Sequence, residues 1–297
     1  MVNYGQQFTD AYIKKDLIRK IIYHNANLLS VGVKVAPQMS LNALDVKFDY
    51  PGSMTGQYPV ADEAVAPREK ITWSEFKLNL QKAQLHYFIT DVAKLRGIAG
   101  TQNEINARRA AEALAKLKDD EILDVLHAGI GGTVAAGAVW TNVSSDPEQD
   151  IVSAWNNILT NSNVTTSELS NMSLIVPAKT YGSLQKLQLI GNIQQSLNKY
   201  LKQTFSISII PTRSTELGTS SSTDALLMVN GNMTARHGVL SDGAARAAGV
   251  PLVEKDRVVG SGDDYLVSQF YRTTVIEDGS AGTGLTYRIY KISGVCT

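Results

Sequence analysis

The sequence has almost no cysteine, and its charges cancel. Cys296 is the only thiol among 297 residues, so an internal disulfide framework and a cysteine-based metal cluster are excluded. The 28 basic and 28 acidic residues give a formal net charge of zero. No whole-molecule field therefore draws the chain to nucleic acid or to an anionic membrane. We expect a fold held by packing, with any nucleic-acid contact confined to a local surface.

Long apolar runs are also missing. The stretch 17–36 is interrupted by four basic or imidazole side chains, unlike the apolar part of a signal peptide. Residues 128–140 are uncharged but too few and too rich in glycine to cross a bilayer. We therefore expect a protein made in the cytosol, with no membrane partner.

The sequence motifs of common enzymes are absent as well. Val134 stands where the third glycine of a dinucleotide fingerprint belongs, and neither a phosphate-binding loop nor a serine nucleophile elbow occurs. The four histidines are far apart and lack a partner at metal-ligand spacing. Asp263 and Asp264, after a glycine-rich turn, fit either a cation site or a simple turn before a strand. We predict no catalytic, cofactor-binding or metal-binding residues, no cofactor, and no enzymatic activity.

An acidic cluster is the strongest local charge feature. It comprises four carboxylates late in a predicted helix: Asp119, Asp120, Glu121 and Asp124. Carboxylates near the C-terminus of a helix oppose its dipole. Two interpretations stay open: a solvated face with lysines nearby, or a surface matched by cations of a neighbouring subunit.

Three segments have helical periodicity. Residues 8–23 predict a short amphipathic helix with four cations, which either packs on a core or serves as an arm that docks on a neighbour or meets nucleic acid. Thr101 and Glu104 have capping-box spacing and predict the start of a long helix that ends before Gly129. A third helix is expected over 147–161, with Asp146 as its cap.

Extended segments flank a polar excursion. Apolar residues alternate over 44–48 and again over 71–80, where a phase shift at residues 74 and 75 suits a β-bulge. The stretch 53–69 between them is small and polar and has little apolar surface to bury. Because long excursions in a compact domain are usually functional, we predict that this ribbon is an assembly arm.

The remainder mixes short strands and helices. Strands are expected at 173–177, 207–211 and 225–229, a helix at 178–188, and an exposed loop at 214–223. Two long strands, 265–276 and 285–295, are predicted to form a closing hairpin around a glycine-rich loop. The expected fold class is α+β.

This order of elements resembles the major capsid proteins of tailed phages of the Hong Kong 97 type, a group that includes encapsulins. Four segments carry the resemblance: the outgoing strand Ile71-Thr72-Trp73-Ser74-Glu75-Phe76-Lys77-Leu78, the turn Ala83-Gln84-Leu85-His86-Tyr87-Phe88-Ile89-Thr90-Asp91, the helix from Glu104 to Gly129, and Met172-Ser173-Leu174-Ile175-Val176-Pro177-Ala178-Lys179-Thr180-Tyr181. The likeness runs from about Ala43 to the end of the chain. It lies in the type and order of the elements, since no invariant signature is present.

The resemblance implies a division of the chain into five parts. These are an N-terminal arm (1–43), an extended β-hairpin loop lying over an adjacent subunit (44–82), a peripheral domain with a long spine helix (83–149), an axial domain (150–262), and a closing hairpin of the peripheral domain (263–297). Some relatives carry an N-terminal scaffolding segment, for which this chain has no room. A separate scaffold, or none, is therefore expected.

The resemblance also implies a function. It suggests a major capsid protein that assembles through pentamers and hexamers into an icosahedral shell around double-stranded DNA, located in the virion and assembled in the host cytoplasm. Portal, scaffold and cement proteins are then the expected partners. Tyr58, Trp73 and Phe76 are candidate inter-subunit contacts on the extended loop, because aromatics contribute much of the energy of interfaces. Alternatively, Trp73 and Phe76 pack within their own sheet.

Two rival functions remain open. An encapsulin nanocompartment has the same fold and encloses a cargo enzyme, although the opening of this sequence does not resemble the usual encapsulin start and a basic arm suits contact with DNA. A small α+β enzyme using unpatterned carboxylates would instead be a monomer or small oligomer with a closed pocket.

Overall fold

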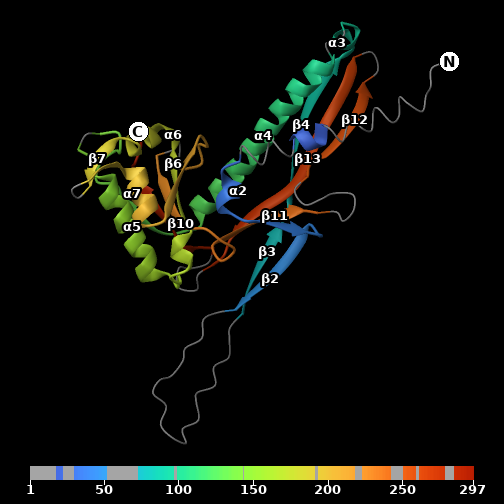
Figure 1. Cartoon of the computed structure of the whole chain (residues 1–297). Coiled ribbons are helices and arrows are strands. Elements are labelled where there is room, and N and C mark those ends of the chain that lie inside the picture. The colour runs from blue at the N-terminus through green and yellow to red at the C-terminus, as the bar shows by residue number, and fades with distance from the viewer. Residues whose placement is uncertain are drawn as a thin grey trace, which may run out of the picture.

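Two β-sheets joined by one long helix form the body, and a two-stranded hairpin projects from it (Figure 1). The structure is a computed structural model. It describes residues 18–22, 30–51, 73–96, 99–142, 144–190, 193–217, 223–241, 250–258, 261–277 and 284–297. Mixed helices and sheets confirm the expected α+β class.

The larger sheet is built around one long strand. It contains β1 (Gln38–Leu41), β4 (Gln81–Thr90), β11 (Ala235–Leu240), β12 (Leu252–Val258) and β13 (Gly262–Val275). β13 pairs antiparallel with β4 and β12 along its first part and with β11 along its second, while β1 runs parallel to β11. The short helix α3 (Asp91–Leu95) follows β4.

The spine helix α4 (Ala99–Ala128) packs along β4 and β13 and continues to the smaller lobe (Figure 1). Its 30 residues correspond to about 45 Å at 1.5 Å per residue. The first part buries Ala107, Ala111 and Leu114 against the large sheet, and the last part buries Ile122 and Leu126 in a second cluster. One continuous rod therefore contributes to both cores.

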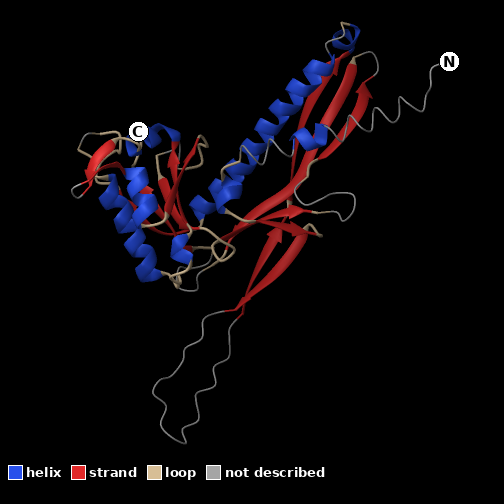
Figure 2. Cartoon of the chain, viewed as in Figure 1, coloured by secondary structure: helices blue, strands red, loops and turns tan. Residues whose placement is uncertain are grey.

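The smaller lobe is a five-stranded sheet covered by helices. Its strands are β5 (Ile130–Ala135), β6 (Met172–Pro177), β9 (Ile207–Thr212), β10 (Ala225–Val229) and β14 (Thr286–Ser293), in the order β5-β14-β10-β6-β9. Its helices are α5 (Pro147–Asn161), the 3₁₀ turn η1 (Glu168–Ser170), α6 (Ala178–Leu184) and α7 (Leu197–Thr204). A small pair, β7 (Leu187–Ile190) and β8 (Ile193–Ser196), lies beside α7. Figure 2 shows helices gathered at this lobe, whereas the long spine helix runs along the large sheet.

The N-terminal part contacts both clusters of the spine helix. Residues 18–22 are helical and bury Ile18 and Ile22 in the core of the large sheet, while Arg19 donates to the Pro251 carbonyl oxygen at 3.0 Å. Packing on a core is therefore confirmed for this turn; the rest of the predicted helix lies outside the described residues. The short helix α2 (Gly32–Val35) then packs against α4.

The predicted closing hairpin is wrong. β13 belongs to the large sheet, and β14 lies between β5 and β10 in the small one, so the two strands do not pair. β11 and β12, which the sequence placed in the axial part 150–262, belong to the large sheet instead. Alternating apolar residues identify a strand but not its partner. Here each of the two strands pairs with other strands of its own sheet.

Two local expectations also need correction, and one is confirmed. The spine helix begins at Ala99, so Thr101 lies inside it and is not its cap; the Glu104 carboxylate accepts from Arg108 one turn later, at 2.8 Å. The helix ends at Ala128, before Gly129 as expected, and Gly131 and Gly132 then lie in β5, where they allow close approach of β14. The helix predicted over 178–188 ends at Leu184.

The cap of α5 and three of the predicted strands are confirmed. Asp146 caps α5 by accepting from the backbone amide of Gln149 at 3.2 Å. The strands predicted at 173–177, 207–211 and 225–229 match β6, β9 and β10 to within one residue at each end. No helix in the described part of the chain is long and apolar enough to cross a bilayer.

Candidate assembly surface

The projecting hairpin has one polar and one apolar face. β2 (Asp45–Pro51) and β3 (Trp73–Asn79) pair antiparallel in unbroken register, so the predicted bulge at residues 74 and 75 is absent. The apolar face carries Val46, Phe48, Phe76 and Leu78, and the polar face carries Asp45, Lys47, Asp49, Glu75, Lys77 and Asn79. Alternating polar and apolar residues are expected in a pair of strands that buries one face and exposes the other.

A small apolar cluster fastens the base of the hairpin to the body. Leu78 is 1% exposed and packs with Leu41 and Leu80. A side chain at Gly238 on β11 would meet Leu78 Cδ2 at 2.2 Å, so only glycine leaves room for this leucine. The hairpin is therefore attached to the large sheet at one end and extends away from both sheets (Figure 2).

Arg236 stabilises the apolar face of the hairpin further from the body, next to Phe48 and Phe76. Its guanidinium carbon lies 5.6 Å from the ring centre of Phe48 and 6.0 Å from that of Phe76, and the two rings stack with centroids 5.4 Å apart. Arg236 Nε also donates to the Asn232 carbonyl oxygen at 3.1 Å. A cation above stacked aromatic rings is favourable and holds the strand pair close to β11.

The three candidate contact residues have different environments. Phe76 packs within the hairpin against Phe48, as one of the two interpretations of the sequence expected. Trp73 lies at the outer end of β3 with 63% of its surface exposed. It shares the polar face with Glu75 and Lys77, and its register partner on β2 is Pro51. Tyr58 lies outside the described residues.

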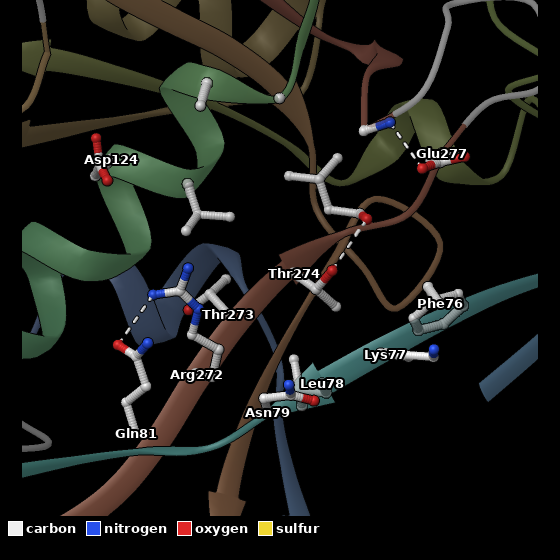
Figure 3. A pocket seen from close by; sticks show the side chains of 15 residues that line it. Phe76, Lys77, Leu78, Asn79, Gln81, Asp124, Arg272, Thr273, Thr274 and Glu277 are labelled. Carbon is white, nitrogen blue, oxygen red and sulfur yellow. Dashed lines mark hydrogen bonds between the residues drawn. The ribbon is translucent and has the colours of Figure 1, made fainter. Parts of the chain in front are cut away.

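A cleft of about 560 Å³ separates the hairpin from the end of the spine helix. Figure 3 shows side chains from β3, α4 and β13 around it, with Arg272 turned toward Gln81 Oε1 at 3.4 Å. Lys77 and Arg272 supply positive charge, and Asp124 and Glu277 supply negative charge. The cleft therefore carries charges of both signs at its lining.

Three of the four acidic residues late in the spine helix have partners within the chain. Asp119 accepts from the Ser30 hydroxyl at 2.6 Å and from the backbone amides of Val31 and Gly32 at 3.0 and 2.8 Å. Asp120 accepts from the Ser214 hydroxyl at 2.6 Å. These contacts tie the segment before α2 and the segment after β9 to the helix.

Glu121 provides the third tether, to β13. It accepts from the Thr273 amide at 2.8 Å and from the Thr273 hydroxyl at 2.5 Å. Burial raises the pKa of Glu121, and the two hydrogen bonds from Thr273, with Arg272 at 3.8 Å, act in the opposite direction. Neither interpretation of the acidic cluster anticipated this role, since partners more than 80 residues away in sequence leave no local signal.

A buried cation lies next to this network. Lys118 is 1% exposed and lies on the buried side of the helix, whereas its apolar neighbour Leu117 is 43% exposed. Burial lowers the pKa of Lys118 to about 8, while Asp119 acts to raise it. Lys118 occupies a buried position that usually holds an apolar residue, at the part of the helix where the two lobes meet it. The apolar periodicity of the helix alone would assign this buried position to the neighbouring residue.

His237 on β11 completes the network. Its Nδ1 lies 3.0 Å from the Thr273 hydroxyl oxygen, and because that hydroxyl donates to Glu121, the imidazole nitrogen is the donor in this contact. Burial, reinforced by Lys118, lowers the pKa of His237 to about 3. The histidine is therefore neutral at physiological pH and serves a structural purpose.

The described residues hold no arrangement suited to a metal ion. No group of three or more histidine, cysteine, aspartate or glutamate side chains within them is placed to bind one. Asp263 pairs with Lys255 at 2.8 Å and Asp264 with His86 at 3.2 Å, so the two adjacent carboxylates have separate partners. Both lie within β13 and not in a turn before it.

Comparison with known sequences and structures separates two levels of similarity. No protein-family profile matches the chain, and no curated protein sequence matches it. Solved structures do match. A virus-like particle protein from Pyrococcus furiosus superposes with a TM-score of 0.63 at 16% identity, over 95% of this chain and 99% of that one.

Two capsid structures are also similar. The capsid of a native GTA particle gives a TM-score of 0.60 at 12% identity, covering 91% of this chain and 90% of that one. The capsid of Myoviridae phage XM1 gives 0.54 at 16% identity, covering 85% and 86%. The long spine helix, the projecting hairpin and the two sheets therefore make up a Hong Kong 97-type capsid fold.

Proposed function

We propose that the chain is the major capsid protein of a tailed phage and that many copies assemble into an icosahedral shell around double-stranded DNA. The fold supports a role in a shell, and the hairpin supplies the observation that carries the proposal. Its polar face ends in a tryptophan, Trp73, that is 63% exposed in the single chain. Such a side chain gains most by burial against another copy.

Assembly then follows from repetition of modest contacts. Each subunit lays its extended loop, 44–82, over a neighbour, and the smaller lobe acts as the axial domain around which pentamers and hexamers close. Trp73 is the leading contact residue, and Phe76 acts indirectly by keeping the hairpin straight. The shell is assembled in the host cytoplasm with portal, scaffold or cement proteins and becomes part of the virion.

In this proposal the protein is structural and has no catalytic residues. The support is the likeness of the fold to proteins that form shells. A second candidate, an encapsulin shell around a cargo enzyme, draws support from the likeness to the Pyrococcus furiosus particle. The nucleic-acid content of purified particles, measured by absorbance at 260 and 280 nm, distinguishes the two.

Paired substitutions test the role of the hairpin. Trp73→Ala is expected to leave the free energy of unfolding of the free subunit within about 0.5 kcal/mol of wild type, because its side chain is exposed, yet to prevent closed particles from forming. Phe76→Ala is expected to lower that free energy by about 1 to 3 kcal/mol, since it removes a stacked ring. Negative-stain microscopy and sedimentation velocity measure assembly. Normal shells from Trp73→Ala would remove the supporting observation.

A further inference from the structure

One part of the smaller lobe carries charge of a single sign. Between Glu168 and Glu216 the sequence contains no aspartate or glutamate, yet it contains Lys179, Lys186, Lys199, Lys202 and Arg213. The spine helix is different, because its arginines pair with glutamates one turn away. In a chain with zero net charge, such a segment is a local concentration of positive charge.

The fold places these five cations on neighbouring elements. Pro177 and Thr212 are register partners in the parallel strands β6 and β9, so Lys179 and Arg213 follow the same ends of adjacent strands. Leu187 and Ser196 are partners in β7 and β8. That register puts Lys186 next to the start of α7, which carries the two remaining lysines.

The two groups are linked by the short helix α6. It runs from Ala178 to Leu184, which is about 10 Å at 1.5 Å per residue. Both α6 and α7 pack against β9. We call the five side chains, together with the elements that carry them, the cationic surface.

The cations of this surface form no ion pair within the described residues. All five side chains are exposed, and none of the ion pairs formed by the described segments involves them. Three acidic residues lie near this region. Glu148 on α5 interacts with Tyr200, Asp120 accepts from the Ser214 hydroxyl beside Arg213, and Glu216 follows Arg213 by three positions. By contrast, Arg288 in the same lobe is paired with Glu168 at 2.7 Å.

Aromatic placement indicates which polyanion the surface fits. Single-stranded nucleic acid is bound by stacking bases on exposed aromatic rings. Here Tyr181, Tyr200 and Phe205 pack against the core, and Phe205 meets Trp155 edge to face at 5.2 Å. These three rings are only partly exposed, so the surface offers more charge than stacking area, and this matches the phosphate backbone of a duplex.

We propose that the cationic surface binds the phosphate backbone of double-stranded nucleic acid without sequence preference. The inference rests on the proposed function, in which the shell encloses such a duplex, and it assigns the contact to the smaller lobe. Lysines suit this role because they act as flexible point charges. Each phosphate contact contributes about 0.9 to the slope of log binding constant against log salt concentration.

The test uses two full-length variants of the free subunit. One carries Lys179→Gln, Lys186→Gln, Lys199→Gln, Lys202→Gln and Arg213→Gln. The control removes five cations elsewhere: Lys47→Gln, Lys77→Gln, Arg108→Gln, Arg109→Gln and Lys116→Gln. Circular dichroism and thermal unfolding first establish that both variants fold. Fluorescence anisotropy with two 30-base-pair duplexes of unrelated sequence then measures binding at several salt concentrations.

Wild type and control are expected to bind both duplexes equally well, with a salt slope of about 3 to 4. The surface variant is expected to lose at least tenfold in affinity, and its slope should fall below about 1. Unchanged binding by the surface variant overturns the proposal. So does tighter binding of a single strand, or equal competition by polyglutamate, which would indicate an acidic protein partner.

Microscopy of the same proteins separates this inference from the proposed function. If wild type forms shells but its subunits bind no duplex, the proposal for the cationic surface is wrong and the capsid proposal stands. If wild type binds duplex through this surface but never forms shells, the capsid proposal fails and the binding surface remains.

Discussion

Asp119 on the spine helix accepts a hydrogen bond from the Ser30 hydroxyl at 2.6 Å, across 89 positions of sequence. The same carboxylate receives the amides at the start of α2, so one side chain fixes the path of the N-terminal segment. An amide cannot replace a carboxylate here, because its nitrogen is a donor facing other donors. This contact makes the acidic run a set of tethers and not a solvated face.

We expect Asp119→Asn to lower the free energy of unfolding of the free subunit by about 2 to 3 kcal/mol, since buried donors lose their acceptor. Urea denaturation followed by circular dichroism measures the change. Asp124→Asn is the matched control, because Asp124 lines the open cleft, and it should shift stability by less than about 0.5 kcal/mol. Equal effects of the two substitutions would contradict the tether.

Lys118→Met is expected to stabilise the subunit at pH 7. Burial lowers the pKa of Lys118 from 10.5 to about 8. Keeping the ammonium protonated in the folded state at pH 7 therefore costs on the order of 2 to 3 kcal/mol. Methionine has a similar shape without the charge. Urea denaturation at pH 7 measures the gain; Lys116→Met, at an exposed position, should change little.

The same lysine predicts how wild-type stability depends on pH. Between pH 8 and 10.5 the unfolded chain binds more protons at this site than the folded chain does. Stability contributed by the site therefore rises with pH through that window. Subtracting the curve of Lys118→Met from that of wild type isolates the contribution. A flat difference would mean that the lysine finds solvent or a partner in the folded state.

Leu78→Ala is expected to loosen the hairpin. Removing a leucine that is 1% exposed leaves a cavity beside Gly238 and costs about 2 to 4 kcal/mol. Hydrogen exchange of the amides in β2 and β3 should speed up more than that of β13. Val46→Ala, on the same face but half-buried, should have a smaller effect. Uniform acceleration of every strand would show that the cluster does not anchor the hairpin specifically.

Gly131→Ala is expected to destabilise the smaller lobe by about 2 kcal/mol or more. A Cβ at this position would lie 2.5 Å from the Thr286 carbonyl oxygen, within the parallel pair of β5 and β14. Gly182→Ala provides the control, since a Cβ there meets nothing within 4 Å and the residue lies inside α6. That change should raise stability by about 0.5 to 1 kcal/mol. Thermal unfolding compares the two.

The helices and strands that the sequence predicted well are those with a complete local signal. α5 combines Asp146 as its cap with proline at its first position, and β10 is an apolar run bounded by polar residues. The spine helix was expected from its apolar stripe. The sequence did not predict the first residues of this helix, because Thr101 has the features of a cap although it lies inside the helix.

Strand partners were not predictable from the sequence. β13 and β14 are adjacent in the chain and both alternate, yet each completes a different sheet. Which sheet each strand joins depends on the strand edges that remain unpaired after the other strands have formed. The sequence of a single strand does not contain this information. Lys118 was missed for a related reason, since its burial depends on the distant elements that close over it.

The sequence likewise predicted some features of the candidate site and missed others. The sequence singled out the excursion 53–69 from its lack of apolar residues to bury, and the structure shows that the strands on either side of it pair as a projecting hairpin. The anchor formed by Leu78, Gly238 and Arg236 was not anticipated, because it joins residues about 160 positions apart. The single-sign segment between Glu168 and Glu216 is readable from the sequence alone. The fold adds that these cations lie on or beside neighbouring elements of the smaller lobe.

Cryo-electron microscopy of the purified wild-type protein tests the central claim most directly. The account predicts closed icosahedral particles in which Trp73 of each subunit is buried against an adjacent subunit. A preparation that contains only monomers or small oligomers, or particles in which the hairpin lies on its own subunit, would contradict it.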